Sequence, residues 1–276
     1  MKKVIKMKKK HILILAISLI LLSIFTFKDL EIAKFLNNDK SIFGLFYEVI
    51  GEMPVYFGVL LFGVTMFNLV KKESSKILAI LITIIGSLLF VIMPARYLPF
   101  FNGLMVFILS IITIILSVLL LLLSRKLSKE FYNKILPLAC VYFITCCLAP
   151  ALVFAIKTFV GRVRFEDLNT SFSNYTRWYV INGITGNYSF PSGHTVSATT
   201  IICLNNLPKC IQLSKKQKIT LYSLTSIHIG ATAFSRMILG RHYGSDVLMA
   251  FLICYAVKEI STAMFFKHRQ DKKFSL

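Results

Sequence analysis

Residues 103–123 read GLMVFILSIITIILSVLLLLL, twenty-one consecutive residues without a charged side chain. A helix that crosses the hydrocarbon core of a bilayer needs about 20 mainly apolar residues. Working outward from this run, we find seven further candidates, of which 195–207 is the shortest: 12–27, 54–70, 77–93, 135–156, 195–207, 219–235 and 247–266. We therefore predict an all-α protein, a polytopic transmembrane helix bundle with about eight spans.

The composition of the whole chain also indicates a lipid environment. Among its 276 residues, 56% are hydrophobic and only 16% are charged, whereas soluble domains carry about 25% charged residues. This composition excludes a disordered chain, a collagen-like chain and a small disulfide-stapled module. The six cysteines form no CxxC pair, and nearly all lie inside apolar runs. We interpret them as small core residues rather than as disulfide partners or zinc ligands.

The basic residues lie mostly in short clusters between the apolar runs. They give a net charge of +20, but clusters that follow membrane topology do not indicate a groove for nucleic acid. The loops on one side of the predicted membrane carry 21 Lys and Arg residues, and those on the other side carry ten. By the positive-inside rule, we expect a multi-pass protein of the cell membrane with both termini cytoplasmic. The basic segment 1–10 also suits a signal peptide, but no small-residue cleavage site follows, so we expect an uncleaved first helix.

Several charged residues lie within or beside the runs. Lys258 is adjacent to Glu259 in the last run, and we favour a local or snorkelling charge over an ion pathway. The loop 28–53 is predicted to form an amphipathic segment on the membrane surface. Glu48 and Glu52 precede Pro54 in this region, and we interpret them as favourable charges at a helix N-terminus.

Six of the ten basic residues on the outer side fall within 157–177 and 236–241. Charges at a membrane edge are often solvated or paired with lipid headgroups. The first of these stretches, KTFVGRVRF at 157–165, contains Lys157 and Arg164, seven residues apart. If the preceding helix continues, this spacing of nearly two turns places both cations on one face, where they can converge on an anion.

The tetrapeptide PSGH at 191–194 precedes the sixth run. Proline near the first turn, followed by Ser192 and Gly193, presents backbone N–H groups to an anion at the positive end of the helix dipole. An ordinary serine-capped helix start would explain the proline and the serine. It would not explain His194, which we expect to stand beside the bound group.

The stretch SRMILGRHYGSD at 235–246 contains Arg236, His242 and Asp246. A spacing of four residues places His242 and Asp246 on the same helical face. The carboxylate can then accept the Nδ1 proton and leave Nε2 free to attack, as in a nucleophile with its orienting group. The alternative is a plain contact on a helix surface.

Together these three stretches resemble the three-part signature of the type 2 phosphatidic acid phosphatases, also called lipid phosphate phosphatases. The resemblance covers about 135–266, which we take as the phosphatase core. Residues 1–134 form an N-terminal transmembrane region of about four helices outside the motifs, and 267–276 form a cytoplasmic tail. Phe165 replaces the proline that follows Arg164 in the family pattern, and we expect an altered loop without loss of charge.

The resemblance implies a role for each matching residue. His242 would be the nucleophile that forms a phosphohistidine, and Asp246 would orient it. His194 would protonate the leaving oxygen and later act as a base toward water. The non-bridging phosphate oxygens would be held by five residues: Lys157, Arg164, Ser192, Gly193 and Arg236. No metal or other cofactor is implied, and the adjacent acids Glu166 and Asp167 are interpreted as charge balance for nearby arginines.

We therefore expect a metal-independent, integral membrane phosphatase with its site on the outer face. Its partners would be membrane lipids and a lipid phosphate substrate, with no nucleic acid. The implied candidates are phosphatidic acid, phosphatidylglycerol phosphate and undecaprenyl diphosphate, and no oligomeric state is implied. A phosphotransferase and a transporter or flippase for phosphorylated lipids remain alternatives. A soluble vanadate haloperoxidase is disfavoured by the eight runs.

Overall fold

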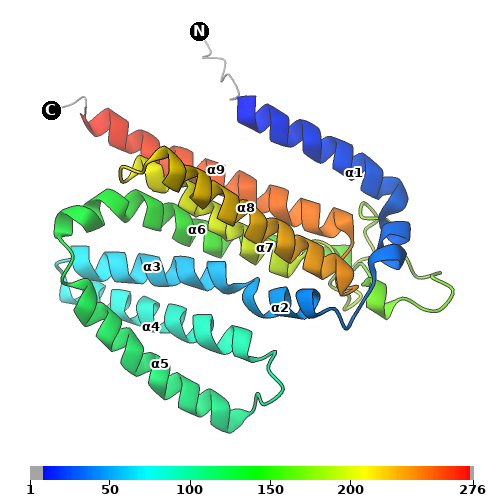
Figure 1. Ribbon diagram of the computed structural model, residues 1–276, viewed down its shortest axis with the longest axis horizontal. Coiled ribbons are helices and arrows are strands. Elements are labelled where there is room, and N and C mark those ends of the chain that lie inside the picture. The colour runs from blue at the N-terminus through cyan, green and yellow to red at the C-terminus, as the bar shows by residue number, and fades with distance from the viewer. Residues whose placement is uncertain (1–8, 274–276) are drawn as a thin grey trace.

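The computed structural model describes residues 9–273, and over this range all regular elements are helices (Figure 1). This confirms the all-helical prediction. In chain order the elements are α1 (Lys9–Leu36), α2 (Ile42–Ile50), α3 (Met53–Leu69), α4 (Glu73–Ala95), α5 (Gly103–Ser124), α6 (Lys129–Val160), the short 3₁₀ helix η1 (Phe165–Asp167), α7 (Gly193–Thr199), the 3₁₀ segment η2 (Thr200–Lys209), α8 (Lys215–Ile238) and α9 (Gly244–Lys273).

Short polar side chains mark where several helices begin. The oxygens of Ser41, Asn102 and Ser128 accept the backbone N–H groups that open α2, α5 and α6. Ser214 and Gln217 form a reciprocal capping box at the start of α8. These capping side chains fix where the helices begin.

Six helical segments are long and apolar enough to cross a membrane: His11–Leu36, Ile42–Leu69, Glu73–Ala95, Gly103–Ser124, Lys129–Asp167 and Gly244–Phe266. The other two predicted spans also form helices but do not reach this threshold. The sixth run is split between α7 and η2, and α8 is long enough but more polar. The polytopic bundle is confirmed, with six apolar spans and two less apolar helical segments.

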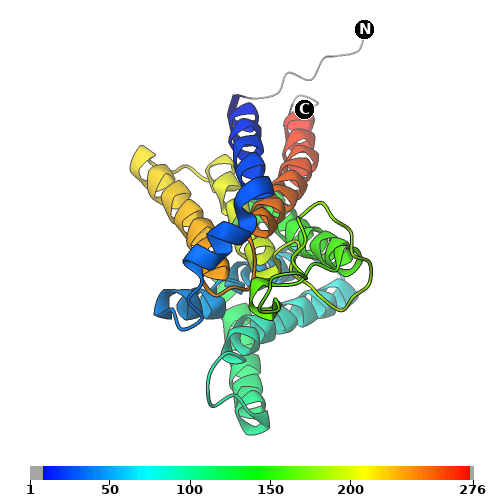
Figure 2. The same cartoon turned by 90° about the vertical axis from the view of Figure 1, so that its right-hand side faces the viewer.

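The bundle is built around α6 and α9. α3 packs against α6, α4 against α3, and α5 mainly against α4, while α1 lies along α9. α4 and α5 extend away from the rest of the bundle in both views (Figures 1 and 2). Large apolar side chains on α5, such as Leu104 and Ile115, are exposed where lipid would cover them.

α3 and α4 approach closely because glycine replaces a side chain at their contact. A Cβ at Gly86 would lie 2.8 Å from the backbone nitrogen of Leu60, and one at Gly63 would lie 2.8 Å from that of Thr83. Neither distance leaves room for a methyl group between the backbones. The pair of glycines therefore fixes the separation of these two helices at two levels.

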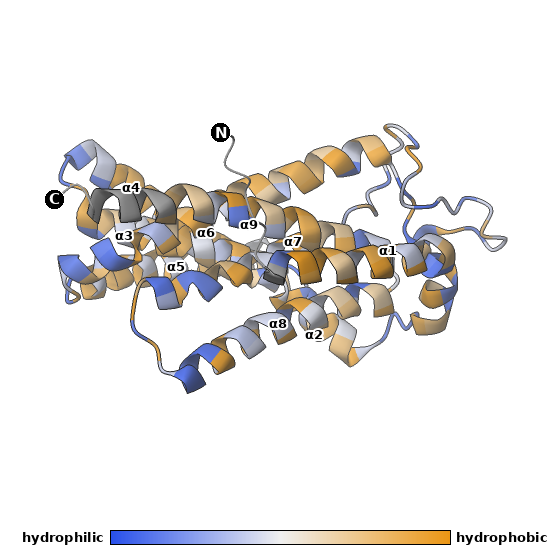
Figure 3. Cartoon of the chain, turned by 90° about the horizontal axis from the view of Figure 1, so that it is seen from above, coloured by the Kyte–Doolittle hydropathy of each residue, from blue (hydrophilic) through white to orange (hydrophobic). Residues whose placement is uncertain are grey.

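The two ends of the bundle differ in what they carry. The described start of α1 and the described end of α9 both point away from the loop 161–192 (Figure 1). Apolar residues occupy the middle of the long helices and polar residues gather toward the ends (Figure 3).

Lys258 is buried in α9 and pairs with Glu259 at 2.9 Å, as expected for a local ion pair. Three of the six cysteines are buried, whereas Cys147 is exposed on α6.

Candidate active site

The first candidate stretch bends at Gly161, and this bend decides where its cations lie. α6 ends at Val160, and Gly161 adopts the left-handed conformation with φ of 59°. A Cβ at this position would lie 2.1 Å from the carbonyl oxygen of Gly183, so the turn requires glycine. The expectation that one continuous helix carries both cations is therefore wrong. Lys157 stands in the last turn of α6, and Arg164 follows the bend at the start of η1.

The second stretch begins α7, with Ser192 as the N-cap. Its hydroxyl oxygen accepts from the N–H of Thr195 at 3.3 Å and from the Thr195 hydroxyl at 2.9 Å. Its own N–H donates to the carbonyl oxygen of Asp246 at 3.1 Å, so Ser192 can reach phosphate only through its hydroxyl hydrogen. The Lys157 Nζ lies 3.6 Å from where a Cβ at Gly193 would stand. The ammonium group and the first turn of α7 therefore face each other across Gly193.

The third stretch places His242, which is 3% exposed, directly before α9. Its Nδ1 lies 3.5 Å from Oδ2 of Asp246, but no aligned hydrogen bond joins the two atoms. Both oxygens of Asp246 accept other bonds, Oδ1 from Arg162 at 2.6 Å and Oδ2 from Ser189 at 2.5 Å and the Tyr243 N–H at 3.0 Å. The two side chains are adjacent as predicted, at a distance longer than that of an ordinary hydrogen bond.

Arg236 ends α8 with an incompletely bonded guanidinium group. The side chain is 1% exposed, and its Nη1 donates to Oε1 of Glu48 at 3.1 Å. Its Nε and Nη2 have no hydrogen-bond partner among the described residues. Buried polar groups are nearly always satisfied, so two open donors on a buried cation indicate a place where an oxyanion would fit.

His194 is held by residues from the N-terminal half of the chain. Its Nε2 lies 2.9 Å from the Tyr97 hydroxyl, and its Nδ1 lies 3.7 Å from Oε1 of Glu52. Arg96 closes the group by donating from Nη2 to Oε2 of Glu52 and to the Tyr97 hydroxyl, both at 2.7 Å.

Backbone contacts bring the three stretches together, since Lys157 faces Gly193 and the Ser192 N–H donates to the Asp246 carbonyl oxygen. Burial, opposed by Asp246 and aided by Lys157 and Arg164, lowers the pKa of His242 to about 4. Burial likewise holds the pKa of His194 well below its usual range, with added effects of Arg236 and His242. Both imidazoles are therefore neutral at pH 7.

Residues 138–270 match the sequence model of the PAP2 superfamily. The C-terminal half of the chain belongs to this superfamily. No curated protein and no solved structure matches the chain. The match confirms the family resemblance drawn from the three motifs, and with the six apolar spans it indicates a membrane phosphatase. All eight predicted site residues lie within this PAP2 domain.

The PAP2 site is completed by α1, which lies outside the matched residues. The guanidinium of Arg162 is fully buried and donates to Asp246, to Asp29 at 3.2 Å and to the Ser245 hydroxyl at 2.8 Å. Asp29, in the C-terminal part of α1, also accepts from the backbone N–H of Ser245 at 3.1 Å and from its hydroxyl. The carboxylates of Asp29 and Asp246 thus share the Arg162 guanidinium. Arg162 binds Oδ1 of Asp246, whereas His242 lies beside Oδ2.

Sequence analysis missed several of these residues. Glu48 and Glu52 were expected to favour a helix N-terminus, but Glu52 makes no capping bond and both acids pair with arginines instead. The surface segment expected at 28–53 is also wrong in part, because α1 continues to Leu36 and α2 packs against α8. The one available signal was the unusual presence of acids beside apolar runs. Glu166 pairs with Arg164 and Arg241, as expected of a charge-balancing residue.

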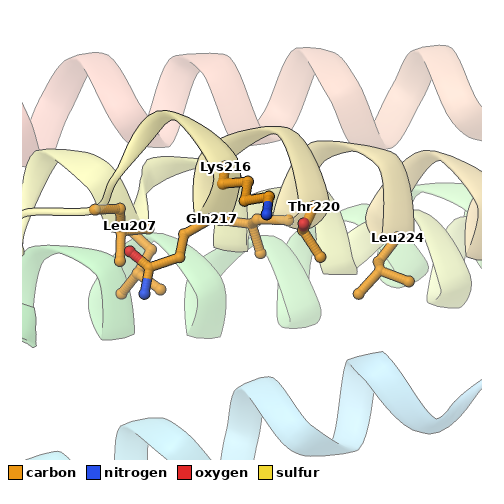
Figure 4. A pocket seen from close by; sticks show the side chains of 7 residues that line it. Leu207, Lys216, Gln217, Thr220 and Leu224 are labelled. Atoms are coloured by element: carbon orange, nitrogen blue, oxygen red, sulfur yellow. The ribbon is translucent and has the colours of Figure 1, made fainter.

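A separate groove lies away from this PAP2 site. It has a volume of about 440 Å³ and runs between the end of η2 and the start of α8 (Figure 4), lined by Leu207, Leu213, Lys216, Gln217, Thr220, Leu221 and Leu224. None of the eight predicted site residues lines it. Within residues 9–273, no three His, Cys, Asp or Glu side chains are arranged to hold a metal ion.

Proposed function

We propose that the chain is an integral membrane lipid phosphate phosphatase that works through a phosphohistidine at His242. The observation that carries this proposal is the contact among the three motifs. Lys157 Nζ faces Gly193, the Ser192 N–H donates to the Asp246 carbonyl oxygen, and the His242 N–H donates to the carbonyl oxygen of Arg236, whose Nε and Nη2 are open. A neutral imidazole has the lone pair that a nucleophile needs. Anion binding alone would require the cations but neither histidine.

In the first step, Nε2 of His242 attacks the phosphorus atom, and the bond from phosphorus to the lipid oxygen breaks. Asp246 lies on the Nδ1 side of the ring and favours the positive charge that develops there. Lys157, Arg164, Arg236 and the first turn of α7, including Gly193 and the Ser192 hydroxyl, stabilise the non-bridging oxygens as negative charge redistributes. In the second step, water attacks the phosphorus and releases inorganic phosphate.

His194 supplies the proton for the leaving oxygen and takes one from the attacking water. Its lowered pKa leaves it neutral in the empty site. A bound phosphate dianion adds negative charge beside it and opposes the effect of Arg236, so substrate binding favours the protonated form. The acid is thus charged when a leaving group is present.

The proposed substrate is a phosphate or diphosphate monoester of a lipid, of the phosphatidic acid, phosphatidylglycerol phosphate or undecaprenyl diphosphate class. Support comes from the site's position at one end of an apolar bundle, where a headgroup would lie. An outer-face orientation is supported by the excess of Lys and Arg in the opposite loops. It also agrees with the directions of α1 and α9, whose described N-terminal and C-terminal ends point away from the site.

The test is phosphate release by the purified protein in detergent micelles with EDTA present. The substrates are lipid monophosphates, polyprenyl diphosphates and soluble sugar phosphates, with and without an added alcohol acceptor. We expect turnover of at least one lipid substrate without added metal. Transfer to the alcohol in place of water would indicate a phosphotransferase, and no turnover of any substrate would contradict the proposal.

A further inference from the structure

Both ring nitrogens of His194 are directed at groups from the N-terminal half of the chain. Nε2 is 2.9 Å from the Tyr97 hydroxyl, and Nδ1 is on the side of Glu52. A general acid must bring one of its protons to the leaving oxygen over a hydrogen-bond distance or through one intervening group. In this arrangement, the group beyond Nε2 is the Tyr97 hydroxyl.

The donors and acceptors around Tyr97 assign a direction to the hydrogen bonds. The Arg96 guanidinium has no lone pair, so it donates to the Tyr97 oxygen. With Nδ1–H facing the Glu52 carboxylate, Nε2 of neutral His194 accepts the Tyr97 hydroxyl hydrogen. When His194 is protonated, Nε2–H donates to the Tyr97 oxygen, and the Tyr97 hydroxyl hydrogen is free to point elsewhere.

We propose that Tyr97 is a catalytic residue that relays the proton between His194 and the leaving oxygen. The proposal rests on the phosphatase function proposed above. Tyr97 and its partner Arg96 lie in the connection between α4 and α5, outside the PAP2 domain. The relay therefore gives the N-terminal transmembrane region a direct part in the chemistry.

The number of protons is conserved in both steps of the relay. As the bond from phosphorus to the lipid oxygen breaks and the bond to His242 Nε2 forms, the lipid oxygen takes the Tyr97 hydroxyl hydrogen and Tyr97 takes the Nε2 proton of His194. His194 is then neutral and the lipid alcohol leaves. When water attacks the phosphohistidine, a water proton passes to Tyr97 and the Tyr97 hydrogen passes to His194. Both residues end the cycle as they began it.

Leaving-group dependence tests this relay. A lipid phosphate releases an alcohol that needs a proton, whereas 4-nitrophenyl phosphate releases an acidic phenol that departs without one. The constant to compare is kcat/KM, because it reports the reaction up to release of the first product. For Tyr97→Phe we expect a loss of about 10² to 10⁴ on lipid phosphate, the usual worth of a general acid, and a much smaller loss on the aryl ester.

Two further variants sharpen the result. His194→Ala combined with Tyr97→Phe should lose no more on lipid phosphate than His194→Ala alone, because both remove one relay. Tyr56→Phe is the matched control, since its hydroxyl contacts Glu52 at 3.4 Å and makes no bond to His194. We expect it to retain most activity on both substrates.

Three outcomes would overturn the inference. Equal losses of kcat/KM by Tyr97→Phe on both esters would indicate a structural role. A retained kcat/KM on the aryl ester is also the evidence that the variant is folded. Wild-type kcat/KM of Tyr97→Phe on lipid phosphate would mean that His194 donates directly. Additive losses in the double variant would mean separate roles. Failure of the wild-type protein on both esters would instead remove the proposed function itself.

Discussion

The Arg162 guanidinium donates to the Asp246 carboxylate at 2.6 Å, and neither side chain is exposed to solvent. The same guanidinium holds Asp29, so one buried cation balances two buried acids. His242 has no aligned bond to Asp246. The position of Asp246, and with it the field at His242, is therefore set mainly by Arg162.

Removal of Arg162 is expected to destabilise the fold as well as the site. Arg162→Gln leaves Asp29 and Asp246 buried near each other without a cation, and breaking such a buried pair costs about 3–5 kcal/mol. We expect a clear fall of the thermal midpoint in detergent. Arg162→Lys should recover only part of it, because an ammonium group cannot replace several fixed guanidinium contacts. A midpoint equal to that of wild type in both variants would contradict this account.

His242 is expected to carry the phosphoryl group. After rapid mixing with ³²P-labelled substrate and alkaline quench, wild-type protein should retain a label that is stable to base and labile to acid. His242→Ala should lose both the label and steady-state phosphate release. His194→Ala should accumulate the label when an aryl ester is used, because hydrolysis of the phosphohistidine needs the base. A labelled His242→Ala protein would place the nucleophile elsewhere.

Acidification is expected to weaken the fold through the buried histidines. The pKa of His242 is about 4 in the folded chain, below the ordinary value near 6.5, so the unfolded chain binds more protons at intermediate pH. The stability from neutral His242 is complete above about pH 6.5 and is lost as the pH falls through about 4, on the order of 3 kcal/mol. The thermal midpoint of wild type should fall more steeply between pH 7 and pH 4.5 than that of His242→Gln. Equal slopes of the thermal midpoint against pH for wild type and His242→Gln would refute this role of His242.

The open donors of Arg236 are expected to bind phosphate oxygens. Arg236→Lys should lower kcat by about 10² to 10³, the cost of removing one positioned donor to a developing anion. Vanadate or inorganic phosphate should raise the thermal midpoint of wild type and have little effect on the variant. Arg177→Lys is the control, because the Arg177 side chain is exposed on the loop 161–192 and donates to the Tyr179 hydroxyl. A similar loss in both variants would argue against a specific role for Arg236.

The sequence predicts the helices well because each apolar run must satisfy its backbone hydrogen bonds internally in lipid. It also predicts eight candidate site residues from the spacing of the three motifs, and all eight lie in the matched PAP2 domain. Whether the helix continues from Lys157 to Arg164 could not be predicted, because the bend at Gly161 depends on contact with Gly183, 22 residues later. The sixth run was expected as one span, but its helix changes to 3₁₀ geometry at Thr200.

Contacts between the two halves of the chain were not predictable from local pattern. Tyr97 and His194 are separated by 97 positions, and Asp29 and Arg162 by 133. Each pair meets only because separate helices pack together. Glu48 and Glu52 looked like helix-start charges for the same reason, since their arginine partners lie far away in the sequence.

The contact of Gly86 with the backbone of Leu60 has a mechanical consequence for catalysis. Gly86 lies in α4 about ten residues before Arg96, which is about 15 Å along a helix. The contact with α3 at Gly86 therefore fixes the position of α4, and Tyr97 follows shortly after the C-terminal end of this helix. One methyl group added at Gly86 would push α4 away from α3 and move Tyr97 away from His194. A substitution within the apolar part of the bundle would therefore lower the rate of the reaction at the distant site.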